Sequence, residues 1–140
     1  MKIRRVALVG GPCSGKSSIL EMLLKVFFGQ LLVVPEMAQA LLAGVMPVPG
    51  RDLRYVSQWQ AHFQRAIVGL QVQAEDAWTI AAEQKGIGLL LCDRGLLDGA
   101  AYWDGGPGAF CRDFDLDRQE VFARYEVVIH LQSLAVRSPE

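Results

Sequence analysis

Residues 6–18 read VALVGGPCSGKSS, an apolar run followed by a glycine-rich loop that carries a lysine and three serines. From Gly10 to Ser17 the loop fits G-x-x-x-x-G-K-[ST] at every fixed position. In such a loop the glycines let successive backbone N–H groups point at a polyphosphate, and the following helix adds the positive end of its dipole. The stretch therefore predicts a phosphate-binding loop between a buried strand and a helix.

The flanking residues favour the same interpretation. Residues 2–9 begin basic and become apolar, as a buried parallel strand does. After Ser17, apolar residues recur at helical spacing as far as Phe27, and Gly29 is an expected stop. The alternative is a glycine turn in an ordinary α/β unit with an incidental Lys-Ser pair; the match at every fixed position within the right context favours the phosphate loop.

Length and composition indicate a single domain, residues 1–140. Hydrophobic residues make up 51% of the chain and the mean hydropathy is +0.22, which suits a compact α/β interior. No apolar run approaches the roughly 18 residues of a membrane span, and the basic start lacks the apolar stretch of a signal peptide, so we expect a cytoplasmic protein. A net charge of −1 with dispersed Lys and Arg gives no reason to expect nucleic-acid binding.

The three cysteines, Cys13, Cys92 and Cys111, form no C-x-x-C pair. Their number and spacing argue against both a disulfide framework and a zinc site, and favour reduced thiols. Cys13 lies inside the phosphate loop, where a small side chain that fills space is its simplest role.

The rest of the chain alternates short apolar runs with helical patterns. This alternation predicts an α/β fold: a three-layer P-loop NTPase sheet of parallel strands flanked by helices, with ligands at the carboxyl ends of the strands. The expected strands after the first are 31–34, 87–92 and 127–131. The expected helices are 36–43, 52–85 and 96–103, and the second of them is expected to bend or break near Gly69. A mobile loop is expected at 105–108. A last helix, capped by Asp115 or Asp117, is expected to run to about Arg124.

Charged residues follow the second and third strands. Asp93 stands where an acidic residue holds Mg²⁺ directly or through water, and capping the next helix is its alternative role. Arg94 would direct a guanidinium at phosphate oxygens, or else form a surface ion pair. Glu36 stands where a general base for an acceptor hydroxyl is expected, and a first-turn glutamate favoured by the helix dipole is equally compatible.

Phosphoryl transfer needs mainly positive charge on the migrating group and a carboxylate that orients the metal or takes the acceptor's proton. Lys16 would reach the β- and γ-phosphates, and Ser17 would offer a hydroxyl to Mg²⁺. The expected catalytic residues are Lys16, Glu36, Asp93 and Arg94; the expected metal ligands are Ser17 and Asp93; the expected nucleotide-binding residues are Gly10, Gly11, Pro12, Cys13, Ser14, Gly15, Lys16, Ser17 and Ser18.

Two further groups of residues have weaker functional interpretations. His62 and His130 are expected to be structural. The stripe Tyr55, Trp59 and Phe63 is core by default, although it could floor an acceptor pocket together with Arg51, Arg54 and Gln58.

Three motifs in this order carry a family resemblance: GGPCSGKSS at 10–18, VVPEMAQALL at 33–42 and LLLCDRGLLDGAAYW at 89–103. Nearly the whole chain resembles bacterial AAA-type ATPase and kinase-like domains, which are relatives of ribosylnicotinamide kinase and of deoxynucleoside and thymidylate kinases. The resemblance implies a P-loop kinase fold, ATP with Mg²⁺, and transfer or hydrolysis of the γ-phosphate.

The sequence departs from that pattern in two places. Members often read Glu-Ala-Ala-Arg after the second strand, whereas this chain has Glu36-Met37-Ala38-Gln39 and so lacks an arginine that could steady an anionic acceptor. Kinases of this fold also carry a fifth strand and an arginine-bearing lid, whereas only 132–140 follow the fourth strand here. The expectation is a domain that lacks the fifth strand and lid, as a C-terminal truncation would. If the sequence is complete, adenine recognition and water exclusion are compromised.

The leading hypothesis is an ATP-binding, kinase-like phosphotransferase that acts on a small metabolite such as a nucleoside. An ATPase without a small-molecule acceptor is the enzymatic alternative, and a nucleotide-binding regulatory module is the non-enzymatic one. The sequence does not fix the acceptor, the base preference or the oligomeric state.

Overall fold

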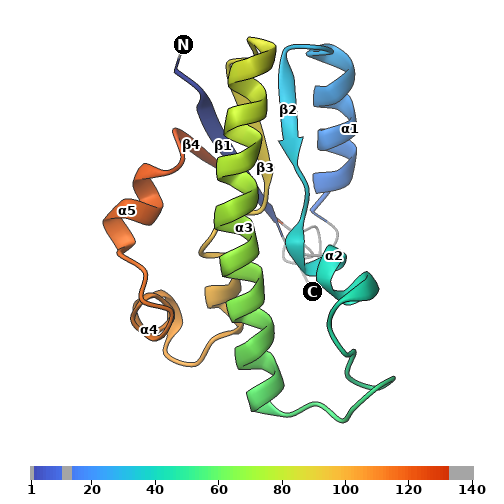
Figure 1. Ribbon diagram of the computed structural model, residues 1–140, viewed down its shortest axis with the longest axis vertical. Coiled ribbons are helices and arrows are strands. Elements are labelled where there is room, and N and C mark those ends of the chain that lie inside the picture. The colour runs from blue at the N-terminus through green and yellow to red at the C-terminus, as the bar shows by residue number, and fades with distance from the viewer. Residues whose placement is uncertain (1, 11–13, 133–140) are drawn as a thin grey trace, which may run out of the picture.

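The computed structural model describes residues 2–10 and 14–132, and a parallel β-sheet forms the centre of this part of the chain (Figure 1). Within it the strand order is β2-β3-β1-β4, so β1, the strand that leads into the glycine-rich loop, lies in the interior of the sheet. This confirms the predicted α/β fold. The strands are β1 (Arg4–Gly10), β2 (Leu31–Val34), β3 (Leu89–Asp93) and β4 (Val127–Leu131).

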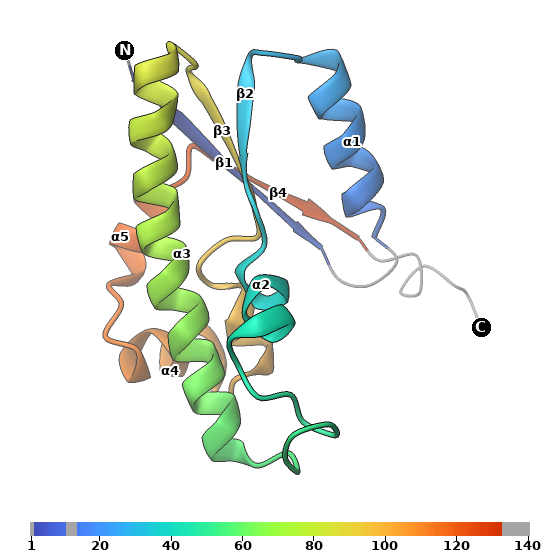
Figure 2. The same ribbon diagram turned by 45° about the vertical axis from the view of Figure 1, so that its right-hand side comes forward.

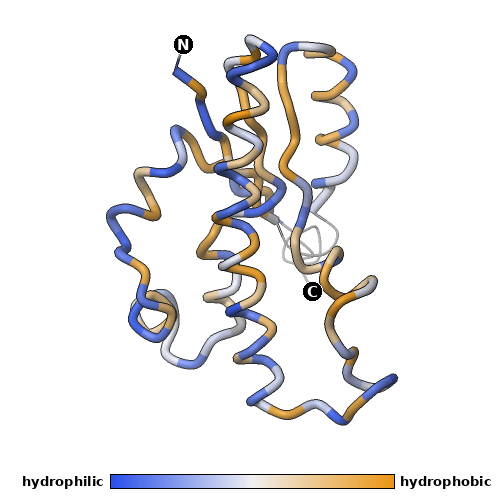
Figure 3. Tube along the Cα trace, in the orientation of Figure 1, coloured by the Kyte–Doolittle hydropathy of each residue, from blue (hydrophilic) through white to orange (hydrophobic). Residues whose placement is uncertain are grey.

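The register of the strands brings their carboxyl ends to one edge. Leu8 of β1 is paired with Asp93 of β3, and Val34 of β2 with Cys92 of β3. The segments that follow β1, β2 and β3 therefore leave the sheet close together. The strands themselves are apolar along most of their length, β2 most evenly, as Figure 3 shows.

Helices cover both faces of the sheet, and the three layers are clear in Figure 2, where α1 and α3 lie on opposite sides of the strands. The apolar core between α3 and the sheet includes Ala7, Leu90 and Cys92, none of which is exposed. The helices are α1 (Lys16–Val26), α2 (Met37–Gly44), α3 (Ser57–Lys85), a 3-10 helix η1 (Asp98–Tyr102), α4 (Gly106–Asp113) and α5 (Arg118–Ala123).

Helix α3 corrects one expectation about Gly69. The helix runs without interruption from Ser57 to Lys85 and begins five residues later than the predicted start at 52. Gly69 lies exposed within it, while Val68 and Gln71 on the adjacent face are buried. The predicted break is therefore wrong, because the roughly 1 kcal/mol cost of an interior glycine is smaller than the gain from burying that face.

A second correction concerns the segment predicted as a mobile loop at 105–108. Gly105 has φ of 90° and caps α4, and Pro107 lies in the first turn of that helix, where a proline is well tolerated. The helix is anchored by Phe110, which is completely buried and contacts the rings of Trp103 and Phe114. The loop prediction gave weight to the glycines and missed this helix-start signal.

The remaining element boundaries differ by small amounts. Of the two candidate caps for the next helix, Asp117 is the one used: its carboxylate accepts hydrogen bonds from the backbone N–H groups of Gln119 and Glu120. β3 begins at Leu89 rather than at 87, and the short helix expected at 96–103 is the 3-10 helix η1. In the described chain α1 ends at Val26, before the predicted Gly29.

Two of the three cysteines can be placed. Cys92 and Cys111 are free and buried, and burial raises the pKa of the Cys92 thiol to about 12. A thiol in that environment is inert. Cys13 lies outside the described residues. No helix within the described residues is long and apolar enough to cross a membrane.

Candidate functional site

The described part of the glycine-rich loop has the geometry its glycines predict. Gly15 has φ of 81°, a left-handed conformation that glycine adopts without strain, and α1 begins at the next residue, Lys16. At Gly10 a Cβ would lie 2.5 Å from Oγ of Ser14, so the close approach of Ser14 to this position requires a glycine. The predicted nucleotide-binding residues Gly11, Pro12 and Cys13 lie outside the described residues.

The first turn of α1 is suited to receive phosphate. Ser17 and Ser18 lie exposed on that turn, and the turn contains no acidic residue. Within the described residues no side chain caps the helix, so its first N–H groups and the positive end of its dipole are available to an anion.

Lys16 is the point at which three of the predicted residues meet. Its Nζ lies 2.5 Å from Oδ1 of Asp93 and 3.6 Å from Oε2 of Glu36. The lysine side chain is only 10% exposed, so these are partly desolvated contacts between the loop and the ends of β3 and β2. The convergence expected from the strand order is therefore present.

Arg94 contacts the same group from the other side. Its Nε lies 2.9 Å from Oε1 of Glu36, and its Nη1 lies 3.9 Å from Oδ2 of Asp98. The Nε–H is not aligned on the carboxylate and has no hydrogen-bond partner among the described residues, so the contact with Glu36 is an ion pair. Glu36 consequently lies between two cationic side chains, Lys16 and Arg94.

Asp98 is a member of this cluster that sequence reasoning missed. Burial raises the pKa of its carboxyl to about 6, although the charges of Arg94, Lys16 and His130 oppose that rise. Its only sequence signal is its position four residues after Arg94, which places the two side chains within reach of each other.

A pocket of about 310 Å³ opens beside Glu36 and Arg94. Its aromatic wall is Trp59 and Phe63, whose rings are stacked with centroids 4.8 Å apart. Gln64 also lines it; this residue is buried, and its Oε1 has no hydrogen-bond partner among the described residues. A volume and lining of this kind suit a small molecule with an apolar ring.

Only some of the residues that the sequence suggested for an acceptor pocket lie in this pocket. Trp59 and Phe63 line it, whereas Tyr55, Arg51 and Arg54 border a separate open depression formed by 49–55. Arg94 and Asp98 also line a further pocket, of about 400 Å³, which reaches Gly10 and His130. These two residues therefore stand between the aromatic pocket and the start of the loop.

A magnesium ion fits the donor set that the sequence predicted. Mg²⁺ prefers oxygen ligands and is usually held by one or two protein oxygens together with phosphate and water. The hydroxyl of Ser17 and the carboxylate of Asp93 are ligands of this kind. No cluster of three or more His, Cys, Asp or Glu residues that could hold a metal ion by themselves occurs at 2–10 or 14–132.

The parallel sheet, the glycine-rich turn after β1 and the lysine at the start of α1 define a P-loop nucleotide-binding domain. A family model described as AAA domain matches residues 5–137, and the chain belongs to this AAA-domain family. A comparison with curated proteins found no match.

Proposed function

We propose that this domain binds Mg-ATP and transfers its γ-phosphoryl group to a hydroxyl of a small metabolite, of which a nucleoside is the best-fitting class. The observation that carries the proposal is the position of Glu36. Its carboxylate lies 3.6 Å from Nζ of the loop lysine Lys16, and the same residue lines the aromatic pocket. A general base for phosphoryl transfer has to face both the phosphate and the acceptor.

The other side chains would have complementary roles. Lys16 and Arg94 would neutralise charge on the γ-phosphoryl group, with Lys16 exchanging its contact with Asp93 for phosphate oxygens. Ser17 and Asp93 would hold the magnesium ion, which neutralises phosphate charge when bound. Glu36 would take the proton of the acceptor hydroxyl while that oxygen bonds to the γ-phosphorus and the bond to the β-phosphate oxygen breaks, releasing ADP.

The lining of the pocket supports a planar acceptor. Stacked aromatic rings such as Trp59 and Phe63 offer a face to a ring system, and the buried Oε1 of Gln64 can accept one hydrogen bond. A base with an N–H group would meet both requirements, and its sugar would carry the hydroxyl. The pocket volume of about 310 Å³ is at the small end of the range for drug-sized ligands.

Radiolabel transfer tests this proposal. Protein incubated with Mg-[γ-³²P]ATP and a panel of nucleosides and vitamins is expected to label at least one panel member. Glu36→Gln should lower the rate by about 100-fold or more, the usual effect of losing a general base, while ATP binding persists. Glu83→Gln, an exposed carboxylate on α3, is the matched control and should keep the native rate.

Three results would contradict the proposal. Free phosphate release that no added metabolite changes would indicate an ATPase without an acceptor. Bound ATP with negligible turnover would indicate a regulatory module. Transfer that is unchanged in Glu36→Gln would remove Glu36 from the reaction.

A further inference from the structure

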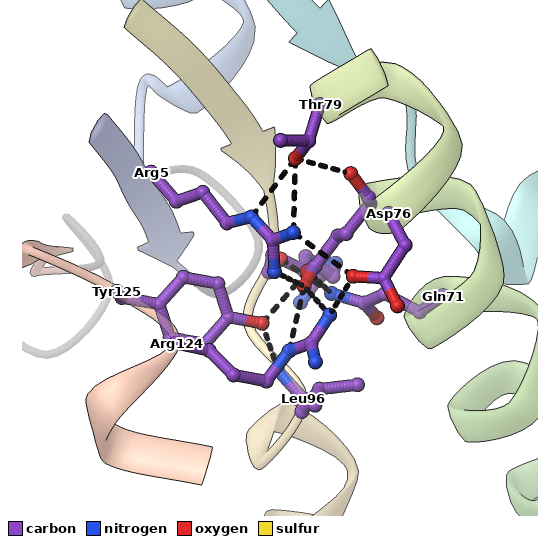
Figure 4. Close-up of polar contacts among 9 residues, drawn as sticks. Arg5, Gln71, Asp76, Thr79, Leu96, Arg124 and Tyr125 are labelled. Carbon is purple, nitrogen blue, oxygen red and sulfur yellow. Dashed lines mark hydrogen bonds and ion pairs between the residues drawn. The ribbon is translucent and has the colours of Figure 1, made fainter. Parts of the chain in front are cut away.

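Glu75, in the middle of α3, is a carboxylate with no exposed surface. Its Oε1 accepts hydrogen bonds from Nε and Nη2 of Arg124 at 3.1 and 3.0 Å, and Nη1 of Arg5 lies 3.9 Å away. Its Oε2 accepts from the hydroxyl of Tyr125 at 2.7 Å and from Nε2 of Gln71 at 3.1 Å. Figure 4 shows the side chains of Arg5, Gln71, Arg124 and Tyr125 converging from β1, α3 and the segment after α5.

Two members of this group reach beyond it to the turn that follows β3. Nε2 of Gln71 also donates to the backbone carbonyl of Arg94 at 2.7 Å. The hydroxyl of Tyr125 accepts from the backbone N–H of Leu96 at 3.1 Å. The amide group of Gln71 has two hydrogens and the tyrosine hydroxyl can both donate and accept, so each side chain can make its two bonds at the same time.

The turn that they hold is strained at Arg94. This residue has φ of 86°, a left-handed conformation that is strained for a residue other than glycine. Its N–H donates to the carbonyl of Leu8 at 3.0 Å, and its carbonyl is held by Gln71. The backbone is therefore fixed on both sides of the residue whose side chain contacts Glu36.

Burial of the Glu75 carboxylate against Arg5 and Arg124, whose side chains are 16% and 20% exposed, is poorly explained by stability alone. A buried ion pair is often no more stabilising than apolar residues of the same volume, because removing charges from water is costly. An apolar core could not form the hydrogen bonds that fix the strained backbone at Arg94. This role would explain why a polar network is present beside the charged cluster.

We propose that Gln71, Glu75 and Tyr125 are positioning residues for Arg94: they hold the turn at 94–96 so that the guanidinium is directed at Glu36 and the neighbouring phosphate site. The inference deepens the proposed function and rests on it for the phosphate, whereas the placement of Arg94 can be tested without any turnover.

The first experiment follows the Nε–H signal of Arg94 by NMR in ¹⁵N-labelled full-length protein. The signal is assigned by its loss in Arg94→Lys. Gln71→Met keeps the size of the side chain but has no donor, and it is expected to shift the Arg94 signal, because Nε would leave its position 2.9 Å from the Glu36 carboxylate. Thr79→Val removes a hydroxyl that bonds Arg5 and the Glu75 carbonyl in the same network, away from the turn, and should leave the signal in place.

The second experiment measures turnover of Mg-ATP. Gln71→Met should lower kcat by about 10-fold with KM for ATP changed less than twofold, and it should have no further effect in an Arg94→Lys background. A merely structural role would lower the rate equally in both backgrounds. Tyr125→Phe, which keeps the ring and loses the bond to Leu96, provides a second variant should Gln71→Met fold poorly.

The outcomes are distinguishable from a failure of the proposed function. An Arg94 signal that is unchanged in both Gln71→Met and Tyr125→Phe would overturn the positioning role. A signal that moves in these variants, in a protein that transfers no phosphate, would support the positioning role and refute the phosphotransferase.

Discussion

At the scale of single residues, the site is a chain of alternating charges around Glu36. Lys16 lies near one oxygen of its carboxylate and Arg94 near the other, and Arg94 also lies near Asp98. Strained backbone conformations cluster at functional sites, where contacts from the surrounding structure hold them in place. The left-handed conformation of Arg94 is consistent with this rule. The residue types were readable from sequence, whereas the position of Asp98 between two pockets depends on the fold of the 93–98 turn.

Asp98 gives a prediction about pH. Its pKa is about 6 in the folded protein, above the ordinary 3.8, so the folded state binds the proton more tightly than the unfolded state does. The stability that the protonated carboxyl contributes is complete below about pH 4 and is lost as the pH rises through 6. Asp98→Asn does not titrate, and its free energy of unfolding relative to native protein should therefore rise by about 1–3 kcal/mol between pH 4 and pH 7.

Urea unfolding at both pH values checks this difference. Asp104→Asn, which removes an exposed carboxyl outside the cluster, is the matched control. A flat difference for Asp98→Asn would mean that its carboxyl is not destabilised by burial.

At the scale of elements, helix α3 connects the aromatic pocket with the buried network around Glu75. The helix lines the aromatic pocket with Trp59, Phe63, Gln64 and Gln71, and it also contributes Gln71 and Glu75 to the buried network. Its helical pattern was evident from sequence because apolar residues recur every three or four positions. The buried Gln64, Gln71 and Glu75 were not, because in sequence they are ordinary polar residues of an amphipathic helix.

Gly69 gives a prediction for this helix. It lies exposed in an unbroken α3, and a Cβ built there meets no atom within 4 Å. Gly69→Ala should therefore raise the free energy of unfolding by about 0.5–1 kcal/mol, measured by urea titration. Gly86→Ala is the contrasting control, because φ at Gly86 is 67° and alanine there should destabilise the protein. A loss of stability in Gly69→Ala would indicate that the helix bends at this residue.

At the scale of the whole molecule, strand order explains why the sequence was informative about the site. In a parallel sheet the carboxyl ends of the strands share an edge, so the loop after β1, Glu36 after β2 and Asp93 after β3 could be expected to meet. The Glu75 network could not be expected, since it joins residues about 50 or more positions apart whose pairing only the folded chain reveals. The helix α4 was missed for a local reason, the weight given to its glycines.

Calorimetric titration of Mg-ATP into the protein measures whether the loop bearing Lys16 binds Mg-nucleotide. We expect saturable binding of one nucleotide per chain. Lys16→Ala should weaken that binding by about 10-fold or more through the loss of a charge-assisted contact with phosphate, while Lys85→Ala at the exposed end of α3 leaves it unchanged. Absence of saturable binding to the native protein, or equal affinity in Lys16→Ala, would show that this loop is not a nucleotide-binding site.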